Sequence, residues 1–389
     1  MNIPQYVKDV LKCLNSCGYE AYMVGGCVRD CLMGNEPNDY DITTNATPEQ
    51  MLLCFKDFKV IPTGIKHGTV TVVSDGENIE VTTYRIDGEY VDNRHPENVT
   101  FTKNLKDDLS RRDFTINAMA MDIDGNIADF YGGKKDLKKR IVKCVGNAET
   151  RFAEDGLRIM RCVRFASTQG YKTEAKTAAA IHDNVHLLQN ISKERIASEL
   201  SKLVCGKNAY DIMTEFQDVI YAVIADVNAD NFKLLCTACD DLYVRLALCF
   251  DDGQRAYDAL SDLKYDNFTK REVKNLIEAK VCAAWDKIEL KKHLGKYGSE
   301  SFARHVSYAK AMSDRDFSGL NSMFDSIISN HECYKISMLD IDGNDIIALG
   351  ASGKQTGEIL DKLLELVITE QLPNENNILI QKAKEIMLE

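Results

Sequence analysis

The sequence predicts an α+β fold, with a mixed β-sheet and a few helices in the N-terminal part and helices alone in the rest. Residues 22–145 contain short runs typical of strands, such as TVTVV and NIEVTTYR, which the turn pair Asp75-Gly76 separates, and later INAMAMDI. Beyond Glu149 such runs nearly vanish, and apolar residues recur at three- and four-residue spacing, as in KERIASELSKLV. We therefore expect a sheet-containing head followed by an all-helical remainder.

Composition narrows the class of protein before any motif is considered. The chain has 389 residues, of which 44% are hydrophobic and 28% charged, so it is long enough for two or more cores. Its opening segment, MNIPQYVKDVLKCLNSCGYE, lacks the apolar core of a signal peptide, and no later run approaches the roughly 20 apolar residues of a membrane-spanning helix. We expect a cytoplasmic protein.

Cysteine usage and net charge bear on redox state and on partners. The 13 cysteines are an odd count, and pairs such as Cys13/Cys17 fall at helical spacing, which is typical of reduced thiols. A net charge of -12 argues against a surface covered with phosphate-binding groups, but a local basic stripe can still bind RNA. The lysine-rich segment 134–143 is one candidate, although a solvated face is the simpler interpretation.

A pair of glycines marks the first candidate site. The run AYMVGGCVRDCLMG predicts a strand that ends at Gly25-Gly26 and a helix that follows through Val28 and Leu32. Glycine lets a backbone approach a ligand closely, and the start of the helix offers free N–H groups to an anion such as a triphosphate. A plain turn is the alternative, because neither the Walker nor the dinucleotide spacing of glycines is present.

Two aspartates follow in NDYDITT. In a strand, Asp39 and Asp41 project to one face, and two like charges at one spot are costly unless a cation lies between them. Carboxylate oxygens suit magnesium, and two such ions can activate an attacking hydroxyl and stabilise a leaving pyrophosphate. An exposed turn would explain Asp-x-Asp alone, but the upstream glycine pair favours a metal site.

Gly-Gly, a helix and Asp-x-Asp in a strand resembles the nucleotidyltransferase superfamily that includes DNA polymerase β. Members use a third carboxylate on a neighbouring strand, and Glu80 in IEVTTYR is the candidate here. An outward-facing, solvated glutamate is the alternative at this position.

The longer motifs look like those of class II CCA-adding enzymes, the bacterial tRNA nucleotidyltransferase and poly(A) polymerase family. They are GGCVRDCLMG, NDYDITTNATPEQ, PTGIKHGTVTVV, IEVTTYR, DDLSRRDFTINAMAMD, EDGLRIMRCVRFA and ERIASEL, in the family's order. The resemblance spans nearly the whole chain, although residues 210–330 are only loosely patterned. It implies a nucleotidyltransferase head (1–148), a helical neck with a base-reading segment (149–206), a helical body (207–330) and a helical tail (331–389).

The resemblance also implies an activity and a set of site residues. Such enzymes add C, C and A to the 3′ end of tRNA from CTP and ATP without a template, so tRNA, ATP, CTP and Mg²⁺ are the expected partners and cofactor. Asp39 and Asp41 match the catalytic, metal-binding pair. The residues that match nucleotide contacts are Gly26, Arg29, Arg112, Asp155, Arg158, Arg161 and Arg164.

Within that set, Asp155 and Arg158 match the pair that reads the incoming base, and Arg112 matches a triphosphate contact. On one helix the pair would share a face, three residues apart. Cytosine and adenine both present an amino donor beside a ring-nitrogen acceptor, which an aspartate and an arginine complement. Uracil and guanine place a carbonyl at the amino position, which costs a buried hydrogen bond, roughly 1–3 kcal/mol. A surface ion pair is the alternative.

Three rival interpretations stay open. An A-adding tRNA nucleotidyltransferase and a bacterial poly(A) polymerase share the head, although the basic stretch and basic C-terminal extension of the polymerases are missing from this sequence. The full-length loop RIDGEYVDNRHPENVTF favours CCA or A addition, because family members that stop after CC have shortened it. An inactive RNA-binding relative is the third rival, and the sequence does not distinguish a monomer from a homodimer.

Overall fold

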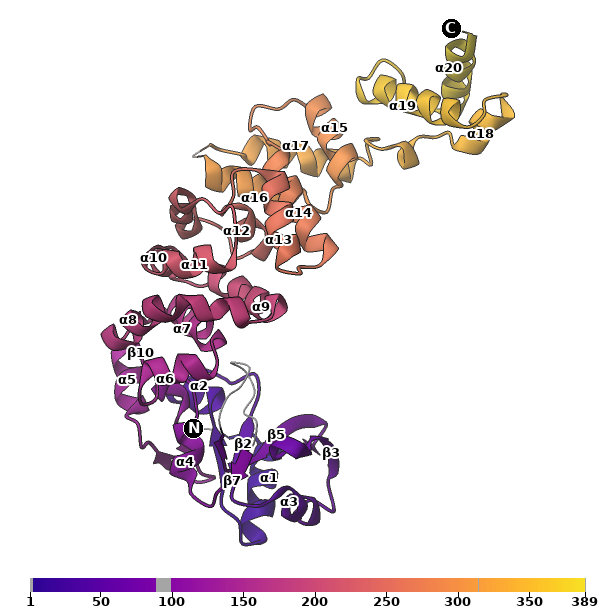
Figure 1. Ribbon diagram of the computed structural model, residues 1–389. Coiled ribbons are helices and arrows are strands. Elements are labelled where there is room, and N and C mark those ends of the chain that lie inside the picture. Colours follow the sequence, from indigo (N-terminus) through magenta and orange to yellow (C-terminus); the bar gives the residue numbers. More distant parts are fainter. Residues whose placement is uncertain (1–2, 89–98, 314, 389) are drawn as a thin grey trace. The chain divides into compact units, whose positions relative to one another are not determined.

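The structure is a computed structural model that describes residues 3–88, 99–313 and 315–388. The chain divides into two compact units, Met1–Ala225 (unit 1) and Asp226–Glu389 (unit 2). Strands and helices make up unit 1, and the described part of unit 2 is helical (Figure 1). The predicted order, a mixed sheet followed by helices, is confirmed.

Unit 1 is built around short strands. In the described residues they are β1 (Ala21–Val24), β2 (Asp41–Thr44), β3 (Lys59–Gly64), β4 (Thr69–Ser74), β5 (Glu77–Thr83), β6 (Arg85–Asp87), β7 (Val99–Phe101), β8 (Ala120–Met121), β9 (Ile127–Ala128), β10 (Ile141–Val142) and β11 (Lys172–Thr173). Seven of them form one sheet in the order β3-β4-β5-β2-β1-β8-β9. Strand β2 runs parallel to β5, and the other neighbours are antiparallel.

Fourteen helical segments surround this sheet and continue the described part of unit 1. They are α1 (Gln5–Ser16), α2 (Gly26–Met33), α3 (Pro48–Cys54), η1 (Ile65–His67), α4 (Leu105–Ser110), η2 (Thr115–Asn117), α5 (Gly133–Lys139), α6 (Ala148–Glu154), α7 (Leu157–Gln169), α8 (Ala175–Asn184), η3 (Val185–Asn190), α9 (Lys193–Val204), α10 (Ala209–Glu215) and α11 (Gln217–Val223). The η segments are 3₁₀ turns. Helix α1 packs against β4, whose Val70 and Val72 are fully buried, as a period of two along a strand requires.

The run INAMAMDI, predicted as a strand, is mostly not one. Only Ala120–Met121 pairs in the sheet, and Asn117 ends the 3₁₀ turn η2. Its backbone N–H donates to the carbonyl of Phe114, and its side-chain Nδ2 donates to Asp113 Oδ1 at 3.2 Å. These local hydrogen bonds form in place of strand pairing at Asn117.

Unit 2 is built from helices, and the buried apolar residues of its described part include two clusters. The helices described are η4 (Ala229–Cys236), α12 (Leu242–Ala247), α13 (Gly253–Asp262), α14 (Asn267–Glu278), α15 (Lys287–Tyr297), α16 (Phe302–Met312), α17 (Ser318–Ser329), η5 (Ile336–Met338), α18 (Gly343–Ala348), α19 (Lys354–Ile368) and α20 (Asn376–Leu388). One cluster joins α15, α16 and α17, and another joins α18, α19 and α20. The four-part division into head, neck, body and tail stays a prediction.

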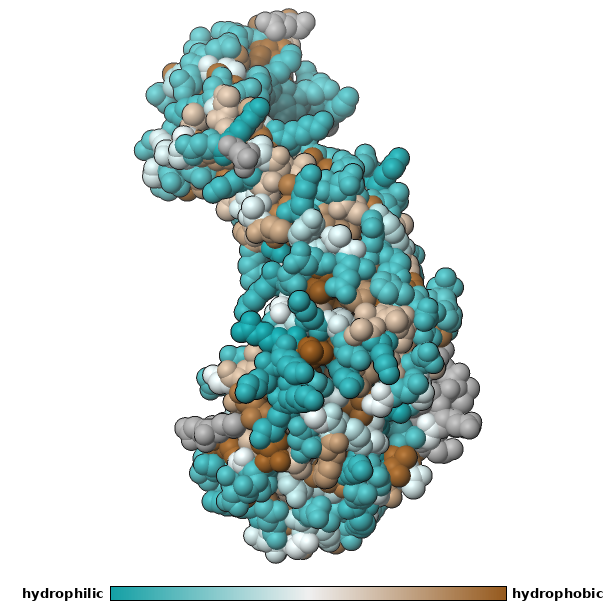
Figure 2. All heavy atoms as spheres, turned by 90° about the vertical axis from the view of Figure 1, so that its left-hand side faces the viewer, coloured by the Kyte–Doolittle hydropathy of each residue, from teal (hydrophilic) through white to brown (hydrophobic). Residues whose placement is uncertain are grey.

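The helices of the described residues include none that is both long and apolar enough to cross a membrane. The face drawn in Figure 2 is mainly hydrophilic, with hydrophobic residues in small separate patches. Of the loop RIDGEYVDNRHPENVTF, Arg85–Asp87 and Val99–Phe101 pair as a two-stranded ribbon, while residues 89–98 lie outside the described part.

Candidate active site

The turn between β1 and α2 brings a glycine next to two charged side chains. Gly25 has a φ of 81°, in the left-handed region that favours glycine. A Cβ at Gly25 would lie 3.0 Å from Nη1 of Arg112 and 3.9 Å from Oδ2 of Asp41. The strand-glycine-helix turn predicted from the sequence is therefore confirmed, and its glycine leaves room for Arg112.

The two predicted metal-binding aspartates lie at one end of β2, but only one is in the strand. Asp41 is the first residue of β2 and pairs with Val24 on one side and Glu80 on the other. Asp39 precedes the strand and is exposed. The prediction of a shared strand is wrong at Asp39, because β1 ends at Val24 and its chain turns away at Gly25, which leaves no partner for a longer ladder.

The carboxyl of Asp41 is held in an unfavourable electrostatic environment. Burial raises its pKa to about 6, with further increases from Asp39 and Glu80, while the Arg112 charge acts in the opposite direction. Among the described residues no three His, Cys, Asp or Glu side chains are grouped closely enough to hold a metal ion on their own. Magnesium keeps water or phosphate oxygens among its ligands, so a crowded carboxylate pair with open positions fits that ion.

A polar pocket of about 280 Å³ opens beside Asp41. Its lining combines four arginines and three aspartates with two glycines and an asparagine. The lining residues are Gly25, Gly26, Asp41, Arg111, Arg112, Asp113, Asn117, Asp155, Arg158 and Arg161. Of the site residues named from the sequence, Arg29, Asp39, Glu80 and Arg164 are not part of this lining.

Asp113 is the centre of a hydrogen-bonded network at the pocket. Arg161 donates to its Oδ2 from Nε at 2.9 Å and from Nη2 at 2.6 Å. Asn117 donates to Oδ1, and Arg29 Nη1 in turn donates to Asn117 Oδ1 at 2.8 Å. Burial alone raises the pKa of Asp113, but the charge and hydrogen bonds of Arg161 outweigh it and hold that pKa at about 2. Arg29 thus touches the pocket through Asn117.

Arg158 and Arg164 lie on α7 but contact different surroundings. Arg158 donates to the backbone carbonyls of Arg111 and Arg151, both at 3.0 Å, and pairs with Glu154. Arg164 donates to Glu199 Oε2 at 2.7 Å and lies over the ring of Phe165. The regular three-residue step of arginines therefore does not place all of them in the pocket.

Three family models match successive parts of the chain. One described as "Poly A polymerase head domain" covers residues 21–143, which include every pocket residue up to Asn117. One described as "Probable RNA and SrmB- binding site of polymerase A" covers residues 170–218. The third, for domain 2 of tRNA nucleotidyltransferases, covers residues 236–383.

Similar proteins match over nearly the full length. The CCA-adding enzyme of Oceanobacillus iheyensis is 36% identical over 95% of this chain and 94% of its own. That of Ligilactobacillus salivarius is 35% identical over 100% of this chain and 98% of its own. The chain belongs to the CCA-adding enzyme family.

Solved structures of CCA-adding enzymes have the same fold. The crystal structure of the Bacillus stearothermophilus enzyme in complex with CTP superposes with a TM-score of 0.86, at 30% identity, over 100% of this chain and 98% of that one. The Thermotoga maritima enzyme complexed with tRNA_CCA has a TM-score of 0.67 at 21% identity, covering 100% of this chain and 97% of that one. The resemblance to class II CCA-adding enzymes and the fold class are both confirmed.

The predicted base-reading pair of this CCA-adding family member does not lie on one helix. Asp155 interrupts the helical run between α6 and α7, with extended φ and ψ of -141° and 104°. Asp155 Oδ1 accepts from the backbone N–H of Leu157, so the side chain caps the start of α7 instead of lying within one continuous helix. The predicted continuous helix is wrong, yet Asp155 and Arg158 line the same pocket.

Sequence reasoning missed three pocket residues. Arg111 and Asp113 flank the named Arg112 in RRDF, so the motif itself contained the signal. Asn117 lies in the INAMAMDI run, which was interpreted only as a strand. A polar side chain inside an apolar run was the signal that could have indicated Asn117 as a site residue.

Proposed function

We propose that this chain completes the CCA end of tRNA, adding C, C and A from CTP and ATP without a template and releasing pyrophosphate. The observation that carries the proposal is the pocket where Asp41, Arg112 and Arg158 meet, because it offers groups suited to a metal ion, a triphosphate and a base. The nearly full-length similarity to CCA-adding enzymes supports the same conclusion.

Asp39 and Asp41 are the proposed ligands of Mg²⁺, with Glu80 as a candidate third carboxylate. When bound, such ions supply the positive charge that activates the attacking 3′-hydroxyl and stabilises the leaving pyrophosphate. The raised pKa of Asp41 supports this role, since crowded carboxylates are relieved by a cation between them.

Arg112 and the start of α2 are the proposed triphosphate contacts. The guanidinium of Arg112 lies beside Gly25, at the end of α2 where backbone N–H groups lack helical partners. Gly26 presents no side chain there, and Arg29 is oriented by Asn117 and by Asp30, which accepts from its Nε at 2.9 Å. Donors that are already oriented cost little reorganisation when charge develops in the reaction.

Asp155 and Arg158 are the proposed base-reading pair, with Arg161 and Arg164 as further contacts. Asp155 Oδ2 accepts from Arg195 Nη2 at 3.0 Å, and Oδ1 accepts from the backbone N–H of Leu157. Each carboxylate oxygen has a second lone pair, so Asp155 can still accept from the amino group of cytosine or adenine. The carbonyl of uracil or guanine would meet an acceptor that the protein holds in place.

The decisive test is nucleotide addition by the purified full-length protein. It is incubated with Mg²⁺, with CTP and ATP of which one is labelled, and with tRNA that lacks its last three nucleotides or only the terminal A. We expect C, C and A to be added to the first substrate and A to the second. Addition of A alone or of long A tracts would indicate one of the rival activities, and no incorporation would refute the proposal. The cytoplasmic location stays a prediction.

A further inference from the structure

Asp108 on α4 is a fully buried carboxyl group inside the head. Its side chain has no exposed area, and such a group is costly to bury unless partners satisfy both oxygens. The hydroxyl of Thr43 donates to Oδ2 at 3.1 Å, and the backbone N–H of Arg85 donates to Oδ1 at 3.3 Å. Asp108 therefore anchors to strand β2, two residues from Asp41, and to the start of β6.

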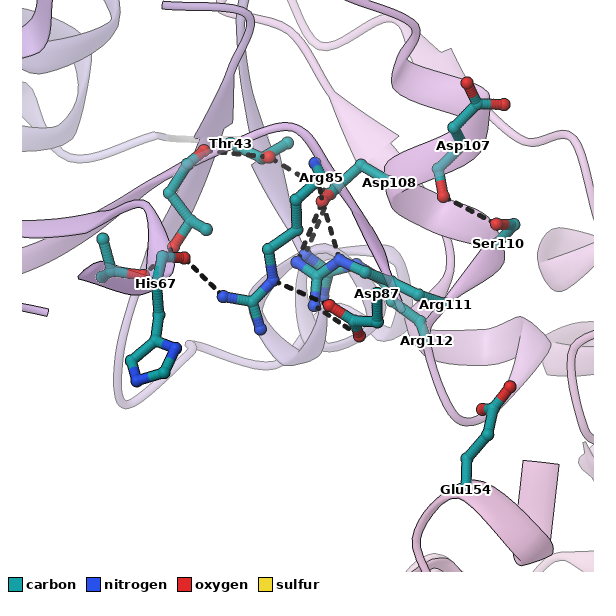
Figure 3. Close-up of polar contacts among 12 residues, drawn as sticks. Thr43, His67, Arg85, Asp87, Asp107, Asp108, Ser110, Arg111, Arg112 and Glu154 are labelled. Atoms are coloured by element: carbon teal, nitrogen blue, oxygen red, sulfur yellow. Dashed lines mark hydrogen bonds and ion pairs between the residues drawn. The ribbon is translucent and has the colours of Figure 1, made fainter. Parts of the chain in front are cut away.

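The same carboxyl group holds the two neighbouring arginines of the pocket. Arg111 Nε donates to Oδ1 of Asp108 at 3.0 Å, and Arg111 Nη2 lies 2.9 Å from the same oxygen. Arg112 Nη2 lies 3.9 Å from Oδ2. Figure 3 shows both guanidinium groups converging on Asp108, with Asp87 on the far side of Arg111 at 3.8 Å.

These contacts form a chain of alternating charges that ends at the catalytic strand. Arg111 lies between Asp87 and Asp108, and Arg112 between Asp108 and Asp41. Arg111 and Arg112 repel each other, since each is a fixed positive charge on adjacent residues. A carboxylate between them offsets that repulsion, so both can stay at the pocket before an anion arrives.

We propose that Asp108 is a positioning residue for nucleotide binding. It fixes Arg111 and Arg112 next to strand β2, beside the proposed triphosphate site. The inference rests on the proposed function, in which Arg112 contacts the triphosphate. Asp108 does not touch the substrate itself. Without its negative charge, Arg112 keeps Asp41 as a carboxylate neighbour, and the arginine then competes with Mg²⁺ for that group.

The test compares Asp108→Asn with the matched variant Asp107→Asn in the full-length protein. Asp107 is the adjacent residue of α4, but it bonds Thr102 and Asn104 and points away from the arginines (Figure 3). Asparagine retains the size of Asp108 but loses its charge. We expect KM for CTP to rise about 10- to 100-fold in Asp108→Asn, with KM for tRNA within about twofold of the wild type, as for residues that orient a binding group. Asp107→Asn should change neither.

An unchanged KM for CTP in folded Asp108→Asn would overturn the proposal, as would equal rises in both KM values. Should that variant not fold, Thr43→Val removes one anchor of Asp108 with little change in shape, and KM for CTP should still rise several-fold. Thr82→Val is its control, because Thr82 Oγ1 pairs with Thr69 instead. A wild-type protein that incorporates no CTP would refute the proposed function, whereas an active wild type without these shifts refutes only the role of Asp108.

Discussion

The pocket of unit 1 and a histidine pair in unit 2 both bury titratable side chains, but the pocket buries an ionised group and the histidines are neutral. Asp113 is buried as an ion, because Arg161 holds its pKa at about 2. His293 and His305 are buried with a ring-to-ring hydrogen bond of 2.8 Å between Nε2 and Nδ1. Burial lowers their pKa values to about 4 and about 3, so both rings are neutral near pH 7.

This difference separates side chains arranged for a ligand from side chains arranged for packing. Paired ions around a pocket cost desolvation energy but present fixed donors and acceptors to a charged substrate. The histidines instead pack among Trp285, Tyr297 and Phe302. Substitutions at the pocket should therefore change activity more than stability, and changes at the histidine pair should do the reverse.

The largest effect is expected from Asp41→Asn. Loss of a metal-binding carboxylate should lower kcat for CTP incorporation by at least about 10³-fold. The same change should raise the free energy of unfolding at pH 7 without Mg²⁺ by on the order of 1–3 kcal/mol, because folding raises the pKa of Asp41 and so disfavours its ionised form. Incorporation assays and urea unfolding measure the two effects.

Asp75→Asn is the control for this variant, since Asp75 is exposed in the turn between β4 and β5. It should retain wild-type activity and stability. An Asp41→Asn protein that is inactive because it is less stable than the wild type would contradict the division between pocket and packing residues. Asp39→Ala should also abolish incorporation of both nucleotides while leaving tRNA binding intact.

The next largest effect is on the choice of base. Asp155→Ala removes the proposed acceptor for the amino group, so UTP incorporation relative to CTP should rise roughly 5- to 150-fold, the equivalent of 1–3 kcal/mol. Competition between labelled UTP and CTP measures this ratio. Arg195→Lys is a second variant for the same measurement. It weakens the ion pair that holds Asp155, so the ratio of UTP to CTP incorporation should rise by a smaller factor. An unchanged ratio in Asp155→Ala would exclude the reading role.

Local pattern was sufficient to predict the strand, glycine turn and helix of the site. The apolar run AYMV forms β1 and ends at Gly25, and Glu80 lies on the strand beside Asp41, as the family resemblance implied. The sheet order was not predictable, since pairing of β2 with both β1 and β5 depends on contacts far apart in the chain.

The errors came from contacts that periodicity does not contain. The helix breaks at Asp155, whose side chain caps α7, and a Cβ at the following Gly156 would lie 3.1 Å from the carbonyl oxygen of Leu187, a residue distant in the sequence. Arg164 follows the same three-residue step as Arg161, but Glu199 on α9 pairs with it instead. Helical spacing indicates which residues share a face, and only the packing of neighbouring helices decides what that face contacts.

A smaller effect should distinguish the two glycines. Gly25→Ala places a Cβ 3.0 Å from Arg112 Nη1 in a residue with positive φ, so we expect a loss of about 1–3 kcal/mol in stability and a KM for CTP raised about tenfold. At Gly26 the nearest atom would be 3.6 Å away, an ordinary contact. Gly26→Ala should therefore keep its stability, and a raised KM there would report a nucleotide contact. Equal stability of both variants would contradict the steric argument.

The smallest effect on activity, and the sharpest contrast with the pocket, is expected from pH. Folding lowers the pKa values of His293 and His305 below the roughly 6.5 of an exposed histidine, so the unfolded chain binds more protons between about pH 6.5 and pH 4. Their contribution to stability is complete above that window and is lost as the pH falls through it. Trp285, the single tryptophan, has its ring centroid 5.0 Å from that of His293 and reports unfolding of this region by fluorescence. The urea midpoint should fall between about pH 7 and pH 5, and it should do so equally in His182→Asn, whose histidine is exposed beside Asp218. A midpoint independent of pH would mean that the buried histidines do not differ from exposed ones, and the contrast between the two clusters would fail.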